Sequence, residues 1–211
     1  MPTFCNKAGL EMKAATIDKI LKIVKENGVI RPRDLESHGI PRKYLNHMYR
    51  KGLLSRVGRG LYVPSDVDPT EHHTIAEVCK RVPGGVVCLI SALQFHGLTT
   101  QMPFEVWMAI DHKARYPREP QLPIRIVRFS GQALNSGIDD SSIEGVPVKV
   151  YNPAKTVADC FKFRNKIGLD VALEALRECL RQRKCTNDDL WRYGKICRVL
   201  NVMKPYLEAL L

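Results

Sequence analysis

The feature that most constrains this chain is a change in the spacing of its apolar residues between residues 16 and 64. Residues 16–28 place apolar side chains at positions 17, 20, 21 and 24 with charges between them, which is the period of an amphipathic helix. After Gly52 the spacing becomes that of strands, in residues 53–57 and 61–63. The two strand segments flank the sequence Gly58-Arg59-Gly60, so they are predicted to form a hairpin with Arg59 at its tip.

Glycines and a proline divide the region before the hairpin into three short helices. Thr16 and Gly28 are predicted to cap and end the first helix, and Gly39 to end the second. The third helix is expected over residues 41–52, because Pro41 suits a first helical turn and Gly52 a helix end. Three helices followed by a hairpin predict a winged helix-turn-helix DNA-binding domain over residues 1–64, whose third helix enters the major groove. The side chains expected to face inward are Ile40, Leu45 and Met48.

The outer face of the third helix carries side chains suited to DNA. Arginine can bridge O6 and N7 of guanine and asparagine can pair with adenine, whereas lysine, histidine and tyrosine suit phosphates. Arg56 and Arg59 would add contacts from the hairpin to the backbone or the minor groove. The alternative is a solvated helix and an ordinary hairpin turn. The predicted DNA-binding residues are Arg33, Arg42, Lys43, Tyr44, Asn46, His47, Arg50, Lys51, Arg56 and Arg59.

Positive charge is concentrated in the same region. Residues 1–64 contain 13 basic and 5 acidic residues, a net charge of +8, whereas residues 65–211 contain 20 and 17, a net of +3. A compact basic domain attracts polyanions through neutralisation of phosphates and release of counterions. Charge, helix order and hairpin therefore agree on double-stranded DNA as the partner.

Composition sets aside several other classes of protein. The longest apolar stretches fall far short of the roughly 18 to 20 residues that span a bilayer, and the first residues lack a basic segment leading into an apolar core. We therefore expect neither a membrane protein nor a secreted one. The seven cysteines include no Cys-x-x-Cys pair, so we expect free thiols in a reducing cytoplasm.

Residues 65–211 are predicted to form a second, mixed α/β domain. A polar segment with a proline, residues 65–70, separates the two domains. Residues 71–82 and 91–98 have helical spacing. Three segments alternate in the manner of strands and suggest a small sheet, and the tail is helical. The strands are expected at 104–110, 124–129 and 146–151, and the tail helices at 153–163, 169–182, 186–193 and 196–210. The fold class is therefore α+β.

No catalytic, cofactor-binding or metal site is predicted. His72 and His73 point about 100 degrees apart on a helix and cannot easily share one ion. Ser91 and His96 lack the surroundings of a hydrolase nucleophile. The pair Asp139-Asp140 is read as part of a solvated loop over residues 137–145. The alternative function is a metal-dependent nuclease or nucleotidyltransferase with a basic DNA-positioning domain, which would use clustered carboxylates.

A polar motif follows the last predicted strand. Asn152 is expected to cap the next helix, Pro153 to begin it, and Thr156 and Asp159 to lie in its early turns. Asp159 is predicted to be a buried polar residue held by Lys155 or by arginine side chains. The functional alternative is a surface for toxin regulation or dimer contact.

Three segments together resemble the AbiEi family, in order along the chain: residues 54–62, 89–98 and 148–160. The resemblance implies an antitoxin and autorepressor of a type IV toxin-antitoxin system. It also implies an AbiEii-like nucleotidyltransferase toxin as functional partner, without need of a stable complex between the two proteins. As a repressor it would bind an inverted-repeat operator, with two protomers on two half-sites, and would need no catalytic activity or cofactor.

Overall fold

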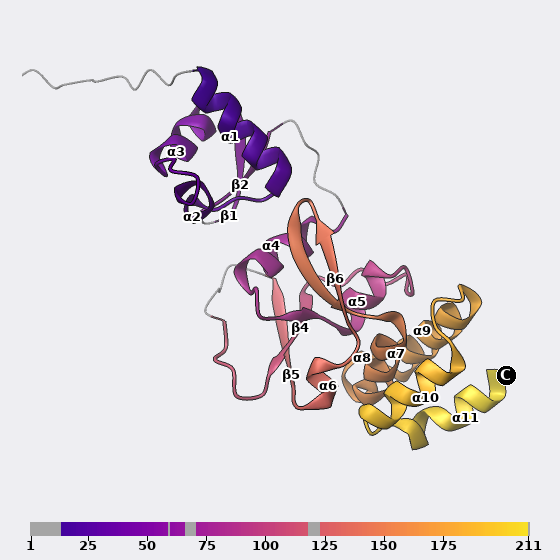
Figure 1. The fold of residues 1–211 in the computed structure, drawn as a ribbon. Coiled ribbons are helices and arrows are strands. Elements are labelled where there is room, and N and C mark those ends of the chain that lie inside the picture. Colours follow the sequence, from indigo (N-terminus) through magenta and orange to yellow (C-terminus); the bar gives the residue numbers. More distant parts are fainter. Residues whose placement is uncertain (1–13, 59, 66–70, 118–122, 211) are drawn as a thin grey trace, which may run out of the picture. The chain divides into compact units, whose positions relative to one another are not determined.

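The computed structural model describes residues 14–58, 60–65, 71–117 and 123–210 (Figure 1). The chain divides into two compact units, Met1–Asp68 and Pro69–Leu211, hereafter unit 1 and unit 2. In the described part of the chain, no helix combines the length and the apolar character that crossing a bilayer requires. The mixed α+β class predicted from the sequence is confirmed.

Unit 1 contains three helices followed by a two-stranded antiparallel hairpin (Figure 1). The first helix begins at Ala14, two residues before the predicted cap Thr16, so that cap is wrong. Gly28, Gly39 and Gly52 adopt positive φ after their helices, as expected of glycines that end helices. The elements are α1 (Ala14–Asn27), α2 (Pro32–Glu36), α3 (Lys43–Arg50), β1 (Leu54–Gly58) and β2 (Leu61–Pro64).

One apolar core joins these elements. α1 contributes Ile20, Ile23 and Val24, and the hairpin contributes Leu54 and Tyr62. The three inward-facing residues predicted around the third helix are buried in the same cluster. The apolar side chains of the helices and of the hairpin therefore share a single core. Because the apolar side of α3 faces this core, its other side faces solvent. The buried residues from the middle of unit 1 are Ile30, Leu35, Ile40, Leu45 and Met48.

Unit 2 is built on a mixed five-stranded sheet in the order β5-β4-β3-β7-β6. β3 is only two residues long, yet it lies in the middle, antiparallel to β4 and parallel to β7. β4 and β5 run parallel, and β6 and β7 form an antiparallel hairpin. The strands are β3 (Val86–Val87), β4 (Val106–Asp111), β5 (Ile124–Phe129), β6 (Ile138–Ile143) and β7 (Val146–Tyr151).

Helices cover this sheet and form the end of the chain (Figure 1). α4 packs on β4, β6 and β7, while the central helix α7 contacts α5, α9 and α10. The main core of unit 2 joins residues of β3, β4 and β5 with these last helices. The helices are α4 (His73–Arg81), α5 (Leu89–Phe95), α6 (Gln132–Asn135), α7 (Pro153–Lys162), α8 (Arg164–Ile167), α9 (Leu169–Arg181), α10 (Asn187–Ile196) and α11 (Leu200–Leu210).

The loop predicted over residues 137–145 is wrong, because most of it is strand β6. Glu144 and Gly145 both have positive φ, of 50° and 74°, which is the geometry of a two-residue turn that matches the twist of a hairpin. This turn folds the polar segment back onto β7 in full register. Asp139 and Asp140 remain exposed, but on an edge strand.

The cysteines also depart from the prediction. Cys179 and Cys185 are paired as a disulfide, so the expectation of free thiols is wrong for these two. Cys179 lies in the last turn of α9, which ends at Arg181, before Cys185. After the helix, Arg183 takes a positive φ, and the Lys184 amide donates to the Cys179 carbonyl at 3.0 Å. This reversal brings the two cysteine Cα atoms to 6.1 Å. The four described free cysteines are all buried: Cys79, Cys88, Cys160 and Cys197.

Candidate nucleic-acid interface

α3 separates apolar and polar side chains sharply. Leu45 and Met48 are 1% and 0% exposed and face the core of unit 1. At 100 degrees per residue, Arg42, Asn46 and Arg50 share the opposite side of the helix, and all three are exposed. This side presents two guanidinium groups and one amide along a single face. Its chemistry is that of groups that hydrogen-bond the edges of bases.

The segment before α3 fixes where this face begins. The Arg31 amide donates to Asp34 Oδ2 at 2.8 Å, which satisfies a backbone donor at the start of α2. Gly39 has a φ of 70°, which a glycine adopts at no steric cost. The next residue, Ile40, is buried and donates its amide to the Leu35 carbonyl at 3.0 Å. α2 and α3 are thus joined by a tight, core-anchored turn.

The hairpin is anchored to the same core. The Ile30 amide donates to the Tyr62 carbonyl at 2.9 Å, and the Tyr62 amide donates back at 3.0 Å. Within the hairpin Arg56 pairs with Tyr62, and the register shifts between Arg56 and Gly58. The Arg56 side chain is exposed on β1. Arg59, predicted at the hairpin tip, lies outside the described residues.

A hydrogen bond that the sequence analysis missed connects the hairpin to the exposed face of α3. The Tyr62 hydroxyl donates to Asn46 Oδ1 at 3.0 Å. The Tyr62 ring also meets Tyr49 edge-on, with ring centroids 6.4 Å apart. Because Oδ1 accepts this bond, the side-chain amide of Asn46 is oriented by β2. No period or spacing signals a contact between residues 16 positions apart on different elements.

The structure places the other predicted DNA-binding residues as follows. Arg33 lies exposed on α2, and Lys43 and Lys51 are exposed at the two ends of α3. Tyr44 and His47 are half-buried, and Tyr44 packs against the core of unit 1. Nine of the ten predicted positions are described, and seven of those nine are exposed.

Residues 18–65 match the model of a family described as a transcriptional regulator, the AbiEi antitoxin. Over these residues, unit 1 is similar to the AbiEi antitoxin family. The matched residues include the described residues of the hairpin and all of α3, so the resemblance seen in the hairpin sequence is confirmed there. The other two segments that carry the resemblance, residues 89–98 and 148–160, lie beyond the matched range.

A solved structure has a similar fold. The crystal structure of the RV2827C protein from Mycobacterium tuberculosis aligns with a TM-score of 0.58 at 14% sequence identity. The alignment covers 95% of this chain and 82% of that one. The likeness therefore concerns the fold of both units. Among curated proteins, none matches the sequence significantly.

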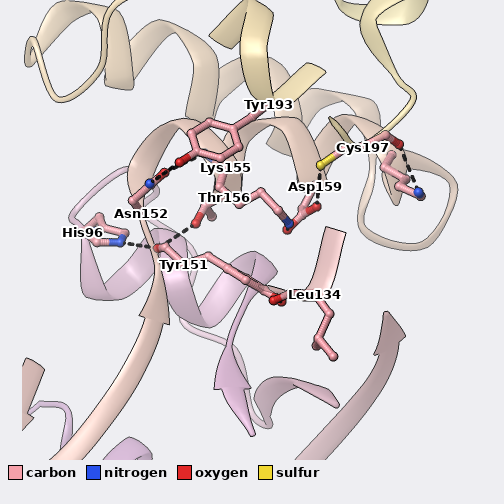
Figure 2. Close-up of polar contacts among 10 residues, drawn as sticks. His96, Leu134, Tyr151, Asn152, Lys155, Thr156, Asp159, Tyr193 and Cys197 are labelled. Atoms are coloured by element: carbon pink, nitrogen blue, oxygen red, sulfur yellow. Dashed lines mark hydrogen bonds and ion pairs between the residues drawn. The ribbon is translucent and has the colours of Figure 1, made fainter. Parts of the chain in front are cut away.

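In unit 2 the polar motif after β7 is internal (Figure 2). Lys155, Thr156 and Asp159 are all 0% exposed, so the alternative that they form an interaction surface is wrong. Lys155 Nζ donates to Asp159 Oδ2 at 2.5 Å, as predicted for a buried polar residue held by Lys155. The ammonium also lies 4.0 Å from the centroid of the Tyr151 ring.

Burial is the largest influence on the pKa values of Asp159 and Cys197. Burial raises the pKa of the Asp159 carboxyl, against the opposing attraction of Lys155 and the hydrogen bonds from Lys155 and Cys197. Cys197 Sγ lies 3.2 Å from Asp159 Oδ1, and burial raises the pKa of this thiol to about 12. The cysteine therefore remains a protonated donor at neutral pH.

The remaining polar contacts join β7 to α7. Asn152 Oδ1 accepts from the Lys155 amide at 2.9 Å, which confirms the predicted cap. The Tyr151 carbonyl accepts from the Thr156 hydroxyl at 3.0 Å and lies 2.7 Å from His96 Nε2. Burial is the largest influence on His96 and lowers its pKa. The motif thus fixes the end of β7 against two helices.

The residues considered for metal or catalytic chemistry are dispersed. His72 stacks on Phe95 and His73 lies 2.7 Å from Glu144, so both histidines have structural partners. Neither is a plain surface histidine, since their side chains are 19% and 17% exposed. In the described ranges, no three histidine, cysteine, aspartate or glutamate side chains gather as ligands for a metal ion.

Proposed function

We propose that this protein is a sequence-specific DNA-binding repressor of its own operon. The match of residues 18–65 to a family of transcriptional regulators supports this role. The observation that carries the proposal is the exposed face of α3, where Arg42, Asn46 and Arg50 line up opposite the buried Leu45 and Met48. An α-helix fits the width of the major groove, so this face would read base edges from within it.

The roles of individual residues follow from their exposure. Arg42, Asn46 and Arg50 would contact bases, because they lie along the middle of the exposed face. Arg33, Lys43 and Lys51 would contact phosphates at its margins, and Arg56 and Arg59 would do so from the hairpin. Tyr44 and His47 are half-buried, and Nε2 of His47 is itself buried, so both side chains would support the helix.

We further propose that the chain is the antitoxin of a type IV system and acts in the cytoplasm against an AbiEii-like nucleotidyltransferase toxin. The family description of unit 1 supports an antitoxin role. A repressor of this kind would bind an inverted repeat as a homodimer on DNA, with half-sites one helical turn or a multiple of it apart. Survival of cells that express the toxin, with and without this chain, tests the antitoxin role.

The DNA-binding proposal is tested by fluorescence anisotropy with the chain's own upstream DNA, titrated over salt and competed with unrelated duplex. Arg42→Ala and Arg50→Ala should each weaken specific binding by about 1 to 3 kcal/mol. Arg177→Ala, which removes an exposed arginine of α9, is the matched control and should leave affinity unchanged. Unchanged operator affinity in both α3 variants would refute the assignment of α3 as the recognition helix.

The hairpin is tested in the same assay through the salt dependence. Arg56→Ala and Arg59→Ala should weaken binding to operator and unrelated duplex alike, and each should reduce the slope of log affinity against log salt by about 1. An unaltered slope would exclude phosphate contacts by these arginines. A reporter fused to the upstream DNA should be repressed by the wild-type chain and released by the α3 variants.

A further inference from the structure

Unit 2 contains an open surface cavity of about 550 Å³, lined in part by exposed basic side chains, that neither DNA recognition nor the core explains. Its wall is made by the residues after β5, the last residue of α7 and the end of α10. Lys162, Lys195 and Arg198 line it, and none of its lining residues is acidic. Ser130 and Gln132 add neutral polar groups. Three cations thus gather in one hollow without a carboxylate to balance them.

These cations could simply complement the carbonyl groups at the end of α10, since positive charge is favourable at a helix C-terminus. Lys162 is used in that way: its Nζ donates to the Cys197 carbonyl at 3.0 Å and keeps further donors available. Lys195 lies in the last turn of α10, so its charge also favours this helix end. Neither the Lys195 nor the Arg198 side chain has a hydrogen bond or ion pair with any described residue. Complementing the helix end therefore leaves the side-chain donors of Lys195 and Arg198 without a partner among the described residues.

The backbone holds Arg198 at the cavity. It takes a φ of 56° directly after the Cys197 cap of α10, a position where glycine is usual. The following amide, of Val199, donates to the Gly194 carbonyl at 2.9 Å and closes the turn. The thiol of Cys197 contacts the buried Asp159, and this contact attaches Cys197 to the core of unit 2 (Figure 2). This part of the cavity wall is therefore a hydrogen-bonded turn anchored to the core of unit 2.

We infer that this cavity binds a small polyphosphate, such as pyrophosphate or a nucleoside di- or triphosphate. Three cations balance the charge of two or three phosphates, and ammonium and guanidinium groups form strong charge-assisted hydrogen bonds to phosphate oxygens. The volume lies within the range of roughly 300–1,000 Å³ typical of pockets for small ligands. It exceeds what a single phosphate fills. The site is independent of the DNA-binding face of α3.

The test is isothermal titration calorimetry of the full chain with pyrophosphate, ATP and GTP, each to about 5 mM, with adenosine as the uncharged control. The three phosphates should bind and adenosine should not. Lys195→Ala and Arg198→Gly should each weaken binding by about tenfold or more, since each removes a charge-assisted contact. Arg198→Gly suits the purpose because glycine adopts the positive φ of this residue without strain.

Two matched controls separate binding from other effects. Arg183→Gly makes the same change at a positive φ of 53° after α9, outside the cavity, and should leave binding unchanged. Arg42→Ala combined with Arg50→Ala removes charge from α3 and should also leave it unchanged. This second control excludes general attraction of anions to the basic unit 1.

Three results would overturn the inference. The first is no binding of any of the three phosphates, and the second is binding that the two cavity variants leave unchanged. The third is a loss of affinity for unrelated DNA duplex in the cavity variants without any binding of pyrophosphate, ATP or GTP. That outcome would assign the three cations to a nucleic-acid surface.

Discussion

Breaking the buried pair of Lys155 and Asp159 from one side should strongly destabilise unit 2, and Lys155→Met tests this directly. Methionine keeps an unbranched side chain of similar length but removes the ammonium that donates to Asp159 at 2.5 Å. Both side chains are 0% exposed, so the carboxylate left behind cannot reach water. Removing one partner of a buried ion pair costs about 3–5 kcal/mol, because the other charge remains buried and uncompensated.

The loss of stability of unit 2 can be measured separately in the full chain. Both tryptophans of the chain, Trp107 and Trp191, lie in unit 2, so intrinsic fluorescence during urea unfolding reports on this unit. In thermal unfolding followed by the same fluorescence, a loss of 3–5 kcal/mol corresponds to a fall of about 10–15 °C in Tm for a unit of this size. The control is Lys204→Met, which breaks a pair of the same i,i+4 spacing with Glu208 on the surface. Its cost should stay below about 1 kcal/mol.

Two further measurements separate the electrostatic cause from lost packing. Lys155→Met with Asp159→Asn removes both charges and should recover most of the loss. In Lys155→Met alone, the folded-state pKa of Asp159 rises further above its unfolded value, because the attraction of Lys155 is gone. The stability of this variant should therefore be greatest at acidic pH and decline as pH rises through that pKa. A loss below about 1 kcal/mol, or a double variant as unstable as Lys155→Met, would refute the reasoning.

Three other predictions concern the same region and use the same fluorescence assay. The pKa of His96 is lowered from 6.5 in the folded state, so its contribution to stability is full above pH 6.5 and declines as pH falls below it; His96→Gln should lack that decline, and an identical pH profile would contradict it. Asn152→Ala removes the cap of α7 and should cost about 0.5–2 kcal/mol, with Asn152→Asp costing less; equal losses would exclude the cap as the cause. Gly137→Ala should destabilise by about 2 kcal/mol or more, because φ is +72° and the added Cβ would lie 2.9 Å from Lys155 Cβ; a variant as stable as wild type would show that the loop shifts freely.

Local patterns predicted most of unit 1. The helical and strand periods, and glycines such as Gly39 and Gly52, record constraints that act within a few residues, so they can be read without knowing the fold. The cap by Asn152 and the i,i+4 pairing of Lys155 with Asp159 are local in the same sense. For these elements the sequence prediction and the structure agree.

What the sequence could not reveal depends on contacts across the chain. β6 is a polar segment that becomes a strand only because β7 provides its partner through the turn at Glu144 and Gly145. The bond from Tyr62 to Asn46 joins a strand to a helix. The cavity gathers residues near 130, 162 and 198, whose proximity follows from how α7 and α10 pack. Tertiary placement, and not propensity, decides each of these features.

The central position of β3 has a consequence for synthesis of the chain. Val87 pairs with Val150, so the middle of the sheet needs a strand made 63 residues later. Unit 1 consists of the first 68 residues, so its core does not wait for a strand that is synthesised later. Because chains fold from the N-terminus as they emerge, unit 1 completes its core while unit 2 still lacks β7. A ribosome stalled before residue 146 would therefore hold a folded unit 1 together with a sheet in which β3 pairs with β4 but lacks β7.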